Sequence, residues 1–269
     1  MYSACRRSIT LIVLFAASLS LAQVRELRVC ADPDNLPFSN RKQQGFENHI
    51  AGLLAQDLNA HLIYVWQRMG KGFVREYINK SACDLLIGIP SGYSGLLTTT
   101  PYYRSTYVFV TARNEKLVPV SLNDPVLHEM KKIGVQVLDD DYTPPAEALA
   151  RRGMQGEIVG FQTLGADGSA IVRAVADHQI DGAIVWGPFA GYYAKHFPGK
   201  LLMNPVSPEV DPPGLPFTFA ISMGMRKGNT QLKTDLERVL EQRQKEIRKI
   251  LTEYGVPQLG LGSQTQARE

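Results

Sequence analysis

Residues that could perform catalysis or bind a metal do not form a recognised pattern in this sequence. The five histidines, His49, His61, His128, His178 and His196, have no spacing that would place two of them on one helix face around a metal ion. The serine of GYSGL lacks the second glycine of a hydrolase nucleophile turn, because Leu96 takes its place. The run Asp139–Asp141 lacks the glycine and terminal glutamate of an EF-hand loop. We therefore expect no enzyme activity, no metal site and no cofactor.

A different pattern, a strand followed by a turn, occurs twice. The segments CDLLIGIPSGYSG (83–95) and IDGAIVWGPFAGYY (180–193) each run from an aspartate through apolar residues into a turn with proline, glycine and tyrosine. Such runs predict a buried strand that ends at the rim of a sheet. In open α/β sheets ligands bind outside the carboxyl ends of the strands, so two facing rims predict a cleft.

The elements around these segments alternate between strands and helices. LRVCA (27–31) is strand-like, the apolar residues of GFENHIAGLLAQDLNA (45–60) repeat at helical spacing, and HLIYVW (61–66) is again strand-like. The alternation begins again after Arg113 and ends in an amphipathic helical region from Asn229 to Tyr254. This order is typical of α/β folds with parallel sheets.

The two runs of elements predict an α/β fold with two lobes and an interlobe cleft. We expect the first lobe to comprise residues 23–111 and 219–269, and the second to comprise residues 112–218. The connecting hinge segments would lie near Thr111–Arg113 and Phe217–Ala220. The cleft would then lie between the two strand ends described above.

The N-terminus is typical of a secretory signal peptide over residues 1–22. Arg6 and Arg7 precede an apolar run, and the small residues Ser20 and Ala22 lie just before the cleavage site. The apolar run is too short for a membrane anchor, and no later segment reaches the roughly 18 apolar residues of a spanning helix. Removal of the peptide lowers the formal charge from +3 to +1, which gives no reason to expect nucleic-acid binding. We expect a soluble exported protein.

Export leaves two cysteines, Cys30 and Cys83. In an oxidising compartment such a pair usually forms a disulfide, but two separate buried cysteines would fit the sequence equally well. Both lie in strand-like runs, and the sequence does not give the Cα separation that a disulfide requires. Both alternatives therefore stay open at this point.

Several segments together resemble the periplasmic solute-binding proteins of the polar amino-acid type, which have a two-lobed type II, family 3-like fold. LRVCADPDNLPFS is similar to their first strand and binding loop. More specifically, LTTTPYYRSTYVFV (97–110) and WGPFAGYYAK (186–195) are similar to the MxaJ/XoxJ family, and the resemblance covers nearly the whole mature chain. Members of that family are solute-binding-like proteins associated with pyrroloquinoline-quinone (PQQ) methanol dehydrogenases. The resemblance implies a periplasmic location, a PQQ-dependent methanol dehydrogenase as partner, and its cytochrome c as a second candidate partner.

The chain departs from the amino-acid-binding proteins where those proteins hold their ligand. Their arginine, which clamps the ligand carboxylate, is missing here, because residues 89–101 contain no arginine or lysine. Trp186 stands where the acid that receives the ligand ammonium would be. Tyr93 and Trp186 are therefore expected to make the cleft aromatic, so that it favours an apolar surface. The alternative is that Trp186 fills the core of a collapsed cleft.

The residues expected at the cleft belong to the binding loop, to one of the two turns, or to the segment after Trp186. They are Asp32, Phe38, Tyr93, Trp186, Pro188, Phe189 and Tyr192. For Asp32, formation of the turn in ADPDNLP is an equally good interpretation.

Two functions agree with these features. The first is a periplasmic accessory protein that binds a PQQ-dependent methanol dehydrogenase and assists its maturation or activation. The second is the substrate-binding component of an ABC transporter for a small solute other than an amino acid. Neighbouring genes for a dehydrogenase and a cytochrome c would favour the first function, and permease and ATPase genes the second.

Overall fold

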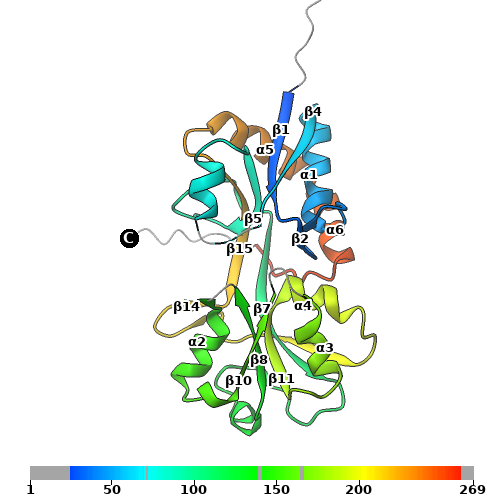
Figure 1. Cartoon of the computed structure of the whole chain (residues 1–269), viewed down its shortest axis with the longest axis vertical. Coiled ribbons are helices and arrows are strands. Elements are labelled where there is room, and N and C mark those ends of the chain that lie inside the picture. The colour runs from blue at the N-terminus through cyan, green and yellow to red at the C-terminus, as the bar shows by residue number, and fades with distance from the viewer. Residues whose placement is uncertain (1–24, 69, 71, 139–140, 164–166, 262–269) are drawn as a thin grey trace, which may run out of the picture.

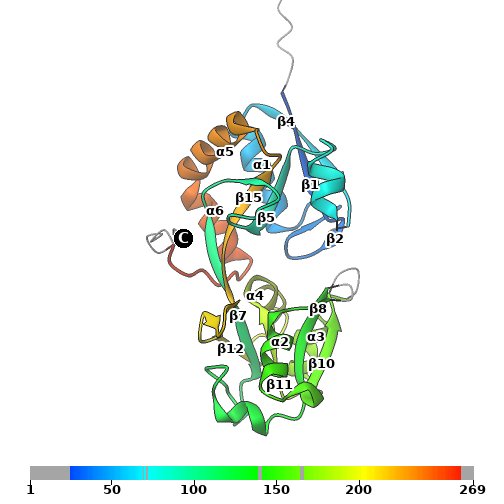
Figure 2. The ribbon, with the colours of Figure 1, turned by 90° about the vertical axis from the view of Figure 1, so that its left-hand side faces the viewer.

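Two α/β lobes lie one above the other along the long axis of the molecule, connected by extended strands (Figure 1 and Figure 2). The computed structural model describes residues 25–68, 70, 72–138, 141–163 and 167–261. The expected signal peptide, residues 1–22, lies outside the described residues. The α/β fold with two lobes is the one that the sequence predicts.

The upper lobe is built on three parallel strands, β1 (Arg25–Ala31), β4 (Ala60–Trp66) and β5 (Leu85–Pro90). Their order is β5-β1-β4, so β1 lies between the other two. Helix α1 (Phe46–Asp57) buries Phe46, Ile50 and Leu54 in the core of this lobe. These residues are four apart and therefore share one face of the helix, as the sequence predicts.

Two helices end the upper lobe, within the helical region that the sequence predicts from Asn229 to Tyr254. They are α5 (Thr230–Gln242) and α6 (Gln244–Glu253), and the chain turns between them at Arg243. The start of α5 agrees with the sequence, because the Asn229 side chain caps it by accepting a hydrogen bond from a backbone N–H of the first turn. The predicted helical region therefore consists of two helices.

The lower lobe repeats the parallel arrangement with β8 (Ile133–Leu138), β10 (Ile158–Gln162) and β11 (Gly182–Trp186). Here β8 is the central strand. Its helices are α2 (Pro144–Arg151), α3 (Ala170–Ala176) and α4 (Gly187–Ala194). Helix α4 follows β11 without a loop, so Trp186 is both the last residue of the strand and the residue before the helix.

Shorter elements complete both lobes. The upper lobe adds β2 (Asp34–Asn35), β3 (Ser39–Asn40), β6 (Leu97–Thr98) and a π-helical turn at Val74–Ile78. The lower lobe adds β9 (Asp141–Tyr142), β12 (Leu201–Pro205) and 3-10 turns at Pro125–Glu129 and Gln155–Glu157.

Strand β7 (Tyr103–Ala112) runs through both lobes, and β15 (Thr218–Met225) returns the chain to the upper lobe. β7 pairs antiparallel with β15 through residues 103–106, and with β11 and β12 through residues 107–112. The hydrogen-bonded strands therefore form one path, β10-β8-β11-β7-β15-β5-β1-β4, because β7 belongs to both lobes. The lobe boundaries and hinge segments expected from the sequence stay a prediction.

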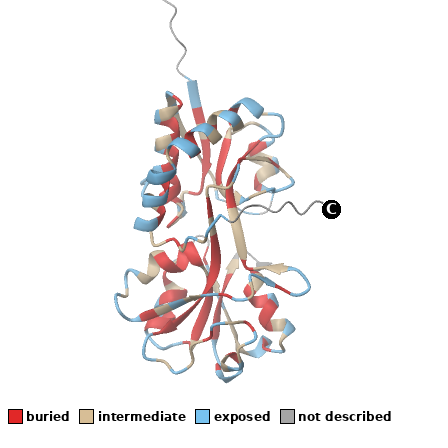
Figure 3. Cartoon of the chain, turned by 180° about the vertical axis from the view of Figure 1, so that it is seen from behind, coloured by how far each residue is buried: buried red, intermediate tan, exposed pale blue. Residues whose placement is uncertain are grey.

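Each lobe has its own buried core, and the partly buried side chains of Phe38, Trp186 and Phe219 each contact clusters of both lobes. The centres of the strands are buried in the two lobes (Figure 3). One cluster fills the upper lobe beneath α1, α5 and α6, and two clusters lie in the lower lobe. Trp186 packs against all three clusters, so it lies where the lobes meet.

The disulfide alternative for the two cysteines is confirmed. Cys30 and Cys83 are bonded, and their Cα atoms are 5.5 Å apart. Cys30 lies on β1, and Cys83 immediately precedes the segment that enters the neighbouring strand β5. Both cysteines are buried in a small cluster with Phe73 and Ile78. The bond therefore joins β1 to the residues just before β5, the strand that pairs with β1.

Replacing Cys83 by serine is expected to lower the free energy of unfolding by roughly 2–4 kcal/mol, because the unfolded chain regains the freedom that the closed loop removes. Urea denaturation of the two proteins measures this difference. Reduction should cause a similar loss in the native protein and no further loss in the variant. Two free thiols titrated in the unfolded, unreduced native protein would contradict the prediction.

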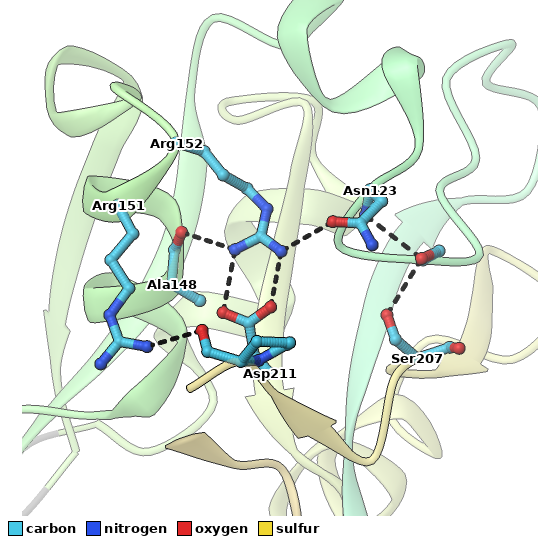
Figure 4. Close-up of polar contacts among 8 residues, drawn as sticks. Asn123, Ala148, Arg151, Arg152, Ser207 and Asp211 are labelled. Atoms are coloured by element: carbon cyan, nitrogen blue, oxygen red, sulfur yellow. Dashed lines mark hydrogen bonds and ion pairs between the residues drawn. The ribbon is translucent and has the colours of Figure 1, made fainter. Parts of the chain in front are cut away.

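A short hairpin leads the chain from the lower lobe into β15, and a buried ion pair holds it in place. The hairpin consists of β13 (Val210–Asp211) and β14 (Leu215–Pro216). Asp211 accepts hydrogen bonds of 3.0 and 2.6 Å from Arg152, which follows α2. The Arg152 guanidinium also donates to a carbonyl of α2 and to the Asn123 side chain (Figure 4). These contacts fix the hairpin against α2.

Candidate functional site

A pocket of about 360 Å³ lies between the two lobes. The upper lobe contributes Asn35, Phe38, Gly88 and Pro90, the connecting strands contribute Tyr107, Phe219 and Ile221, and the lower lobe contributes Gln136, Thr143, Thr163, Trp186 and Phe189. Among these described wall residues none carries a charged side chain. The pocket thus offers an apolar surface with a few neutral polar groups, which is a common composition for binding sites.

Three aromatic rings of the pocket wall contact one another. The Trp186 ring lies 5.3 Å from Tyr107 and 5.7 Å from Phe219, measured between ring centroids, and both contacts are edge-to-face. These three rings come from β11, β7 and β15, the strands that meet where the lobes join. Edge-to-face contacts are favourable for aromatic rings and hold each ring in a defined orientation. The wall is therefore built in advance of any occupant.

The polar groups of the wall are tied to the same aromatic residues. The side-chain oxygen of Gln136 accepts a hydrogen bond of 2.7 Å from the backbone N–H of Trp186. Thr143 donates a hydrogen bond of 2.8 Å to the Gln136 backbone carbonyl. Burial raises the pKa of the Tyr107 hydroxyl far above its usual value, an effect that the nearby Thr143 side chain partly opposes. Tyr107 is therefore neutral at physiological pH.

A buried acid lies directly behind one wall residue. Only 7% of Glu47 is exposed, and a Cβ atom on Gly88 would lie 1.9 Å from the Glu47 carboxyl oxygen. Gly88 also has a positive φ of 82°, so this wall position requires glycine twice over. Burial, and then the negative charge of Asp32, raise the pKa of Glu47 from 4.5 to about 8. Glu47 is therefore mostly protonated at neutral pH, and the pocket stays uncharged.

The lobes also contact each other directly beside the pocket. Tyr192 of α4 stacks on Tyr254, which follows α6, with ring centroids 5.8 Å apart and an interplanar angle of 13°. The hydroxyl of Tyr193 donates a hydrogen bond of 3.1 Å to the carbonyl of Leu36 in the upper lobe. The lower lobe is thus held against the upper one by α4, the helix that begins at the pocket wall.

The structure brings three of the seven predicted cleft residues into the pocket wall. These are Phe38, Trp186 and Phe189. Trp186 is half-buried, lines the pocket and also packs against both lobes, so it combines the two interpretations that the sequence left open. A role in binding for any of the seven residues stays a prediction.

The other four predicted residues do not line the pocket. Asp32 is buried and accepts a hydrogen bond of 2.9 Å from the backbone of Asp34, in agreement with its role in the turn. Tyr93 is 45% exposed on the turn after β5. Pro188 is buried in the first turn of α4, and Tyr192 makes the interlobe stack described above.

Nine wall residues were not among the predicted cleft residues, and they include Tyr107, Gln136, Thr143 and Phe219. The sequence identified Tyr107 and Gln136 only as members of strands. Phe219 lies within the expected hinge segment Phe217–Ala220, and this position is the sequence feature that could have indicated a wall residue. A cleft between two lobes is bounded at its base by the strands that connect them, so residues of the connections should have been included in the prediction.

Neither a metal site nor a membrane span is found in the described part of the chain. No three His, Cys, Asp or Glu side chains there are placed to hold a metal ion. No described helix is both long enough and apolar enough to cross a bilayer.

Two proteins named MoxJ are similar to this chain over most of its length. MoxJ of Paracoccus denitrificans is 31% identical over an alignment of 263 positions, which covers 91% of this chain and 94% of the relative. MoxJ of Methylorubrum extorquens is 32% identical and covers 91% of this chain and 85% of the relative. No family model matches the chain.

Solved structures of the same group have a similar fold. The crystal structure of MxaJ from Methylophaga aminisulfidivorans matches with a TM-score of 0.78 at 27% identity, over 87% of this chain and 100% of that chain. The periplasmic binding protein XoxJ from Methylobacterium extorquens matches with a TM-score of 0.71 at 37% identity, over 87% and 99%. An ancestral arginine-binding protein, at 18% identity and a TM-score of 0.58, shares the fold alone. The chain therefore belongs to the MoxJ/MxaJ/XoxJ family and has the two-lobed fold of the periplasmic binding proteins.

Proposed function

We propose that this protein is a periplasmic accessory protein that binds a PQQ-dependent methanol dehydrogenase and assists its maturation or activation, without an enzyme activity of its own. The observation that carries the proposal is the uncharged, aromatic pocket between the lobes, in a member of a family whose solved relatives include MxaJ and the periplasmic binding protein XoxJ. The cytochrome c of the dehydrogenase is a second candidate partner. The family resemblance seen in the sequence supplies the identity of the partner.

The chemistry of the pocket supports a polypeptide occupant. An amino acid would bring two charges, and no wall residue in the described part of the chain is charged. Trp186, Phe38 and Phe189 instead present apolar rings, which form the centres of many protein interfaces. About 360 Å³ is enough for one or two large apolar side chains of a partner. Tyr93 and Tyr192, which lie outside the wall, would contact the flanks of such a segment.

Binding alone is sufficient for activation. A protein that binds one conformation of the dehydrogenase more tightly than another shifts the population toward that conformation by its differential affinity. The interlobe contacts of Tyr192 and Tyr193 hold the pocket as a preformed surface, which lowers the cost of ordering on binding. No covalent step or cofactor is needed for this role.

A second candidate function is the substrate-binding component of an ABC transporter for a small solute other than an amino acid. The observation that favours it is the size of the pocket, which lies within the range of small-molecule sites. A transporter component would leave the dehydrogenase itself unaffected, and this difference separates the two functions.

The test is the activity of the dehydrogenase per assembled subunit, in cells with and without this protein. We expect the dehydrogenase to be present but poorly active without it.

Trp186→Ala should weaken binding to the dehydrogenase by about 2 kcal/mol or more, roughly 30-fold in Kd, because a buried tryptophan at the centre of an interface contributes strongly. Val120→Ala, a change at a side chain that is 58% exposed, is the matched control and should leave binding unchanged.

Unchanged specific activity and an unaltered cofactor content of the dehydrogenase would refute the accessory role. If excess solute in the medium restores growth of the deletion strain, the transporter function is the correct one.

A further inference from the structure

Gln136 of β8 is a buried amide in the wall of the pocket. Only 5% of the residue is exposed. Its side-chain oxygen accepts the 2.7 Å hydrogen bond from the backbone N–H of Trp186. Because a backbone N–H can only donate, the amide oxygen must face it. The Trp186 N–H therefore fixes the orientation of the Gln136 amide, and the amide NH2 group points away from Trp186 N.

The amide nitrogen of Gln136 has no acceptor among the described residues. In the part of the chain that the structure describes, Gln136 takes part in side-chain hydrogen bonding only through the oxygen that faces Trp186. The described polar atoms that are fully buried and lack a partner do not include this nitrogen. The nitrogen is therefore in part accessible. Since the residue is almost wholly buried, the space that this nitrogen reaches is the pocket that Gln136 lines. An occupant with an acceptor would satisfy a donor that is otherwise poorly solvated.

The surroundings of this donor select against charged occupants. The described wall has no charged side chain, and Glu47 behind Gly88 is mostly protonated at neutral pH. A carboxylate or ammonium group would lose its hydration in the pocket without gaining an opposite charge. The rings of Trp186 and Tyr107 offer apolar contact beside the Gln136 amide. The favoured occupant therefore combines an apolar group with an uncharged acceptor.

We propose that Gln136 is the specificity-determining polar contact of the pocket, and that its Nε2 donates a hydrogen bond to an uncharged carbonyl carried beside a large apolar group. This inference rests on the proposed function for the identity of the partner: the occupant is a dehydrogenase segment with a large apolar side chain and its neighbouring backbone carbonyl. A free solute with an uncharged amide offers the same chemistry, and the experiment separates the two sources.

Tryptophan fluorescence can report the occupancy of the pocket directly. The chain contains two tryptophans, and Trp66→Phe leaves Trp186 as the single one. In this background we expect N-acetyl-phenylalaninamide to change the Trp186 emission and to bind more tightly than toluene, which lacks an acceptor. Phenylalanine, with both charges, should not bind measurably.

Two substitutions of Gln136 isolate the donor. Gln136→Met should lower the affinity for N-acetyl-phenylalaninamide about tenfold and change the affinity for toluene less than twofold. Gln136→Glu, which keeps an acceptor for the Trp186 N–H, should lower the amide affinity at least as much. Gln231→Met, at an exposed glutamine, is the matched control. Equal losses for amide and toluene in Gln136→Met, or no binding of the amide to the native pocket up to its solubility limit, overturn the proposal.

The source of the carbonyl is decided by the affinity of the same variants for the dehydrogenase. A parallel loss of amide and dehydrogenase affinity in Gln136→Met identifies a segment of the dehydrogenase as the occupant. A loss of amide affinity with unchanged dehydrogenase affinity supports the role of Gln136 toward a free solute. That second result removes the pocket from the proposed accessory function, so the two proposals can fail separately.

Discussion

Replacing Glu47 by glutamine is expected to abolish most of the fall in stability that the native protein shows between about pH 4.5 and pH 8. Burial, and then the charge of Asp32, raise the pKa of Glu47 from 4.5 to about 8 in the folded protein. Between these values the unfolded chain releases the proton and the folded chain keeps it. The unfolded state then binds fewer protons, so the free energy of unfolding falls by about 1.4 kcal/mol for each pH unit. The stabilisation is fully present below pH 4.5, and roughly 4–5 kcal/mol is lost once the pH passes the folded-state pKa.

Urea denaturation at intervals from pH 5 to pH 8.5 measures this effect as the difference between the native protein and Glu47→Gln. The difference removes the contributions of all other titrating groups, which the two proteins share. Glu241→Gln, at an exposed position, should keep the pH dependence of the native protein. A Glu47→Gln protein that loses as much stability as the native one between pH 5 and pH 8 would show that Glu47 is already ionised in the fold.

Ionisation of Glu47 is also expected to affect binding in the pocket. Gly88 lines the pocket and lies against the Glu47 carboxyl, so ionisation above pH 8 places a negative charge behind the wall. A charge in a poorly solvated position attracts water and disfavours an apolar occupant. Binding of N-acetyl-phenylalaninamide should therefore weaken above pH 8 in the native protein and not in Glu47→Gln.

Local sequence patterns were sufficient for most elements of this fold and failed where distant contacts decide. The apolar spacing of residues 229–254 predicts a helical region and does not indicate where a helix within it ends. The structure ends α5 before Arg243, which donates hydrogen bonds of 2.8 and 2.6 Å to Asp57 of α1, 186 residues away in sequence. No periodicity within the helix carries information about such a partner. The Asn229 cap, in contrast, depends on neighbours in sequence and was predicted correctly.

The candidate site was predicted only in part, because strand order is visible in the sequence and the direction of individual side chains is not. Trp186 ends a strand that faces the other lobe, and strand order alone places it at the pocket. Tyr93 ends the corresponding turn of the upper lobe, but a Cβ atom on Gly95 would lie 2.7 Å from its ring, so the ring lies over its own turn. Side-chain direction within a turn depends on local backbone geometry that the sequence pattern does not give. Gln136 was missed because a glutamine within an apolar strand has no distinguishing signal until its partner, the Trp186 N–H, is known.

Breaking the ion pair that holds the β13–β14 hairpin is expected to have a similarly large effect on stability. The Asp211 side chain is 3% exposed and the Arg152 side chain 18% exposed, and among described residues Asp211 receives its side-chain hydrogen bonds from Arg152 (Figure 4). Arg152→Met leaves a buried carboxylate without its partner, which typically costs about 3–5 kcal/mol. The neighbouring Arg151 is the matched control. Its ion pair with Glu147 is partly exposed, and its one hydrogen bond to the hairpin goes to the backbone carbonyl of Pro212, so Arg151→Met leaves no buried charge without a partner and should cost less than about 1 kcal/mol.

The double variant Arg152→Met with Asp211→Leu separates the cost of a lone buried charge from the worth of the pair itself. Removing both charged groups is expected to recover most of the stability lost in Arg152→Met, because desolvation of the unpaired carboxylate dominates that loss. Urea denaturation of the two single variants and the double variant gives the coupling between the two side chains. The hairpin leads into β15, which carries Phe219 in the pocket wall, so Arg152→Met should also weaken N-acetyl-phenylalaninamide binding and the double variant should restore it. If Arg152→Met and Arg151→Met are equally stable, the hairpin is held by its apolar contacts and not by the buried ion pair.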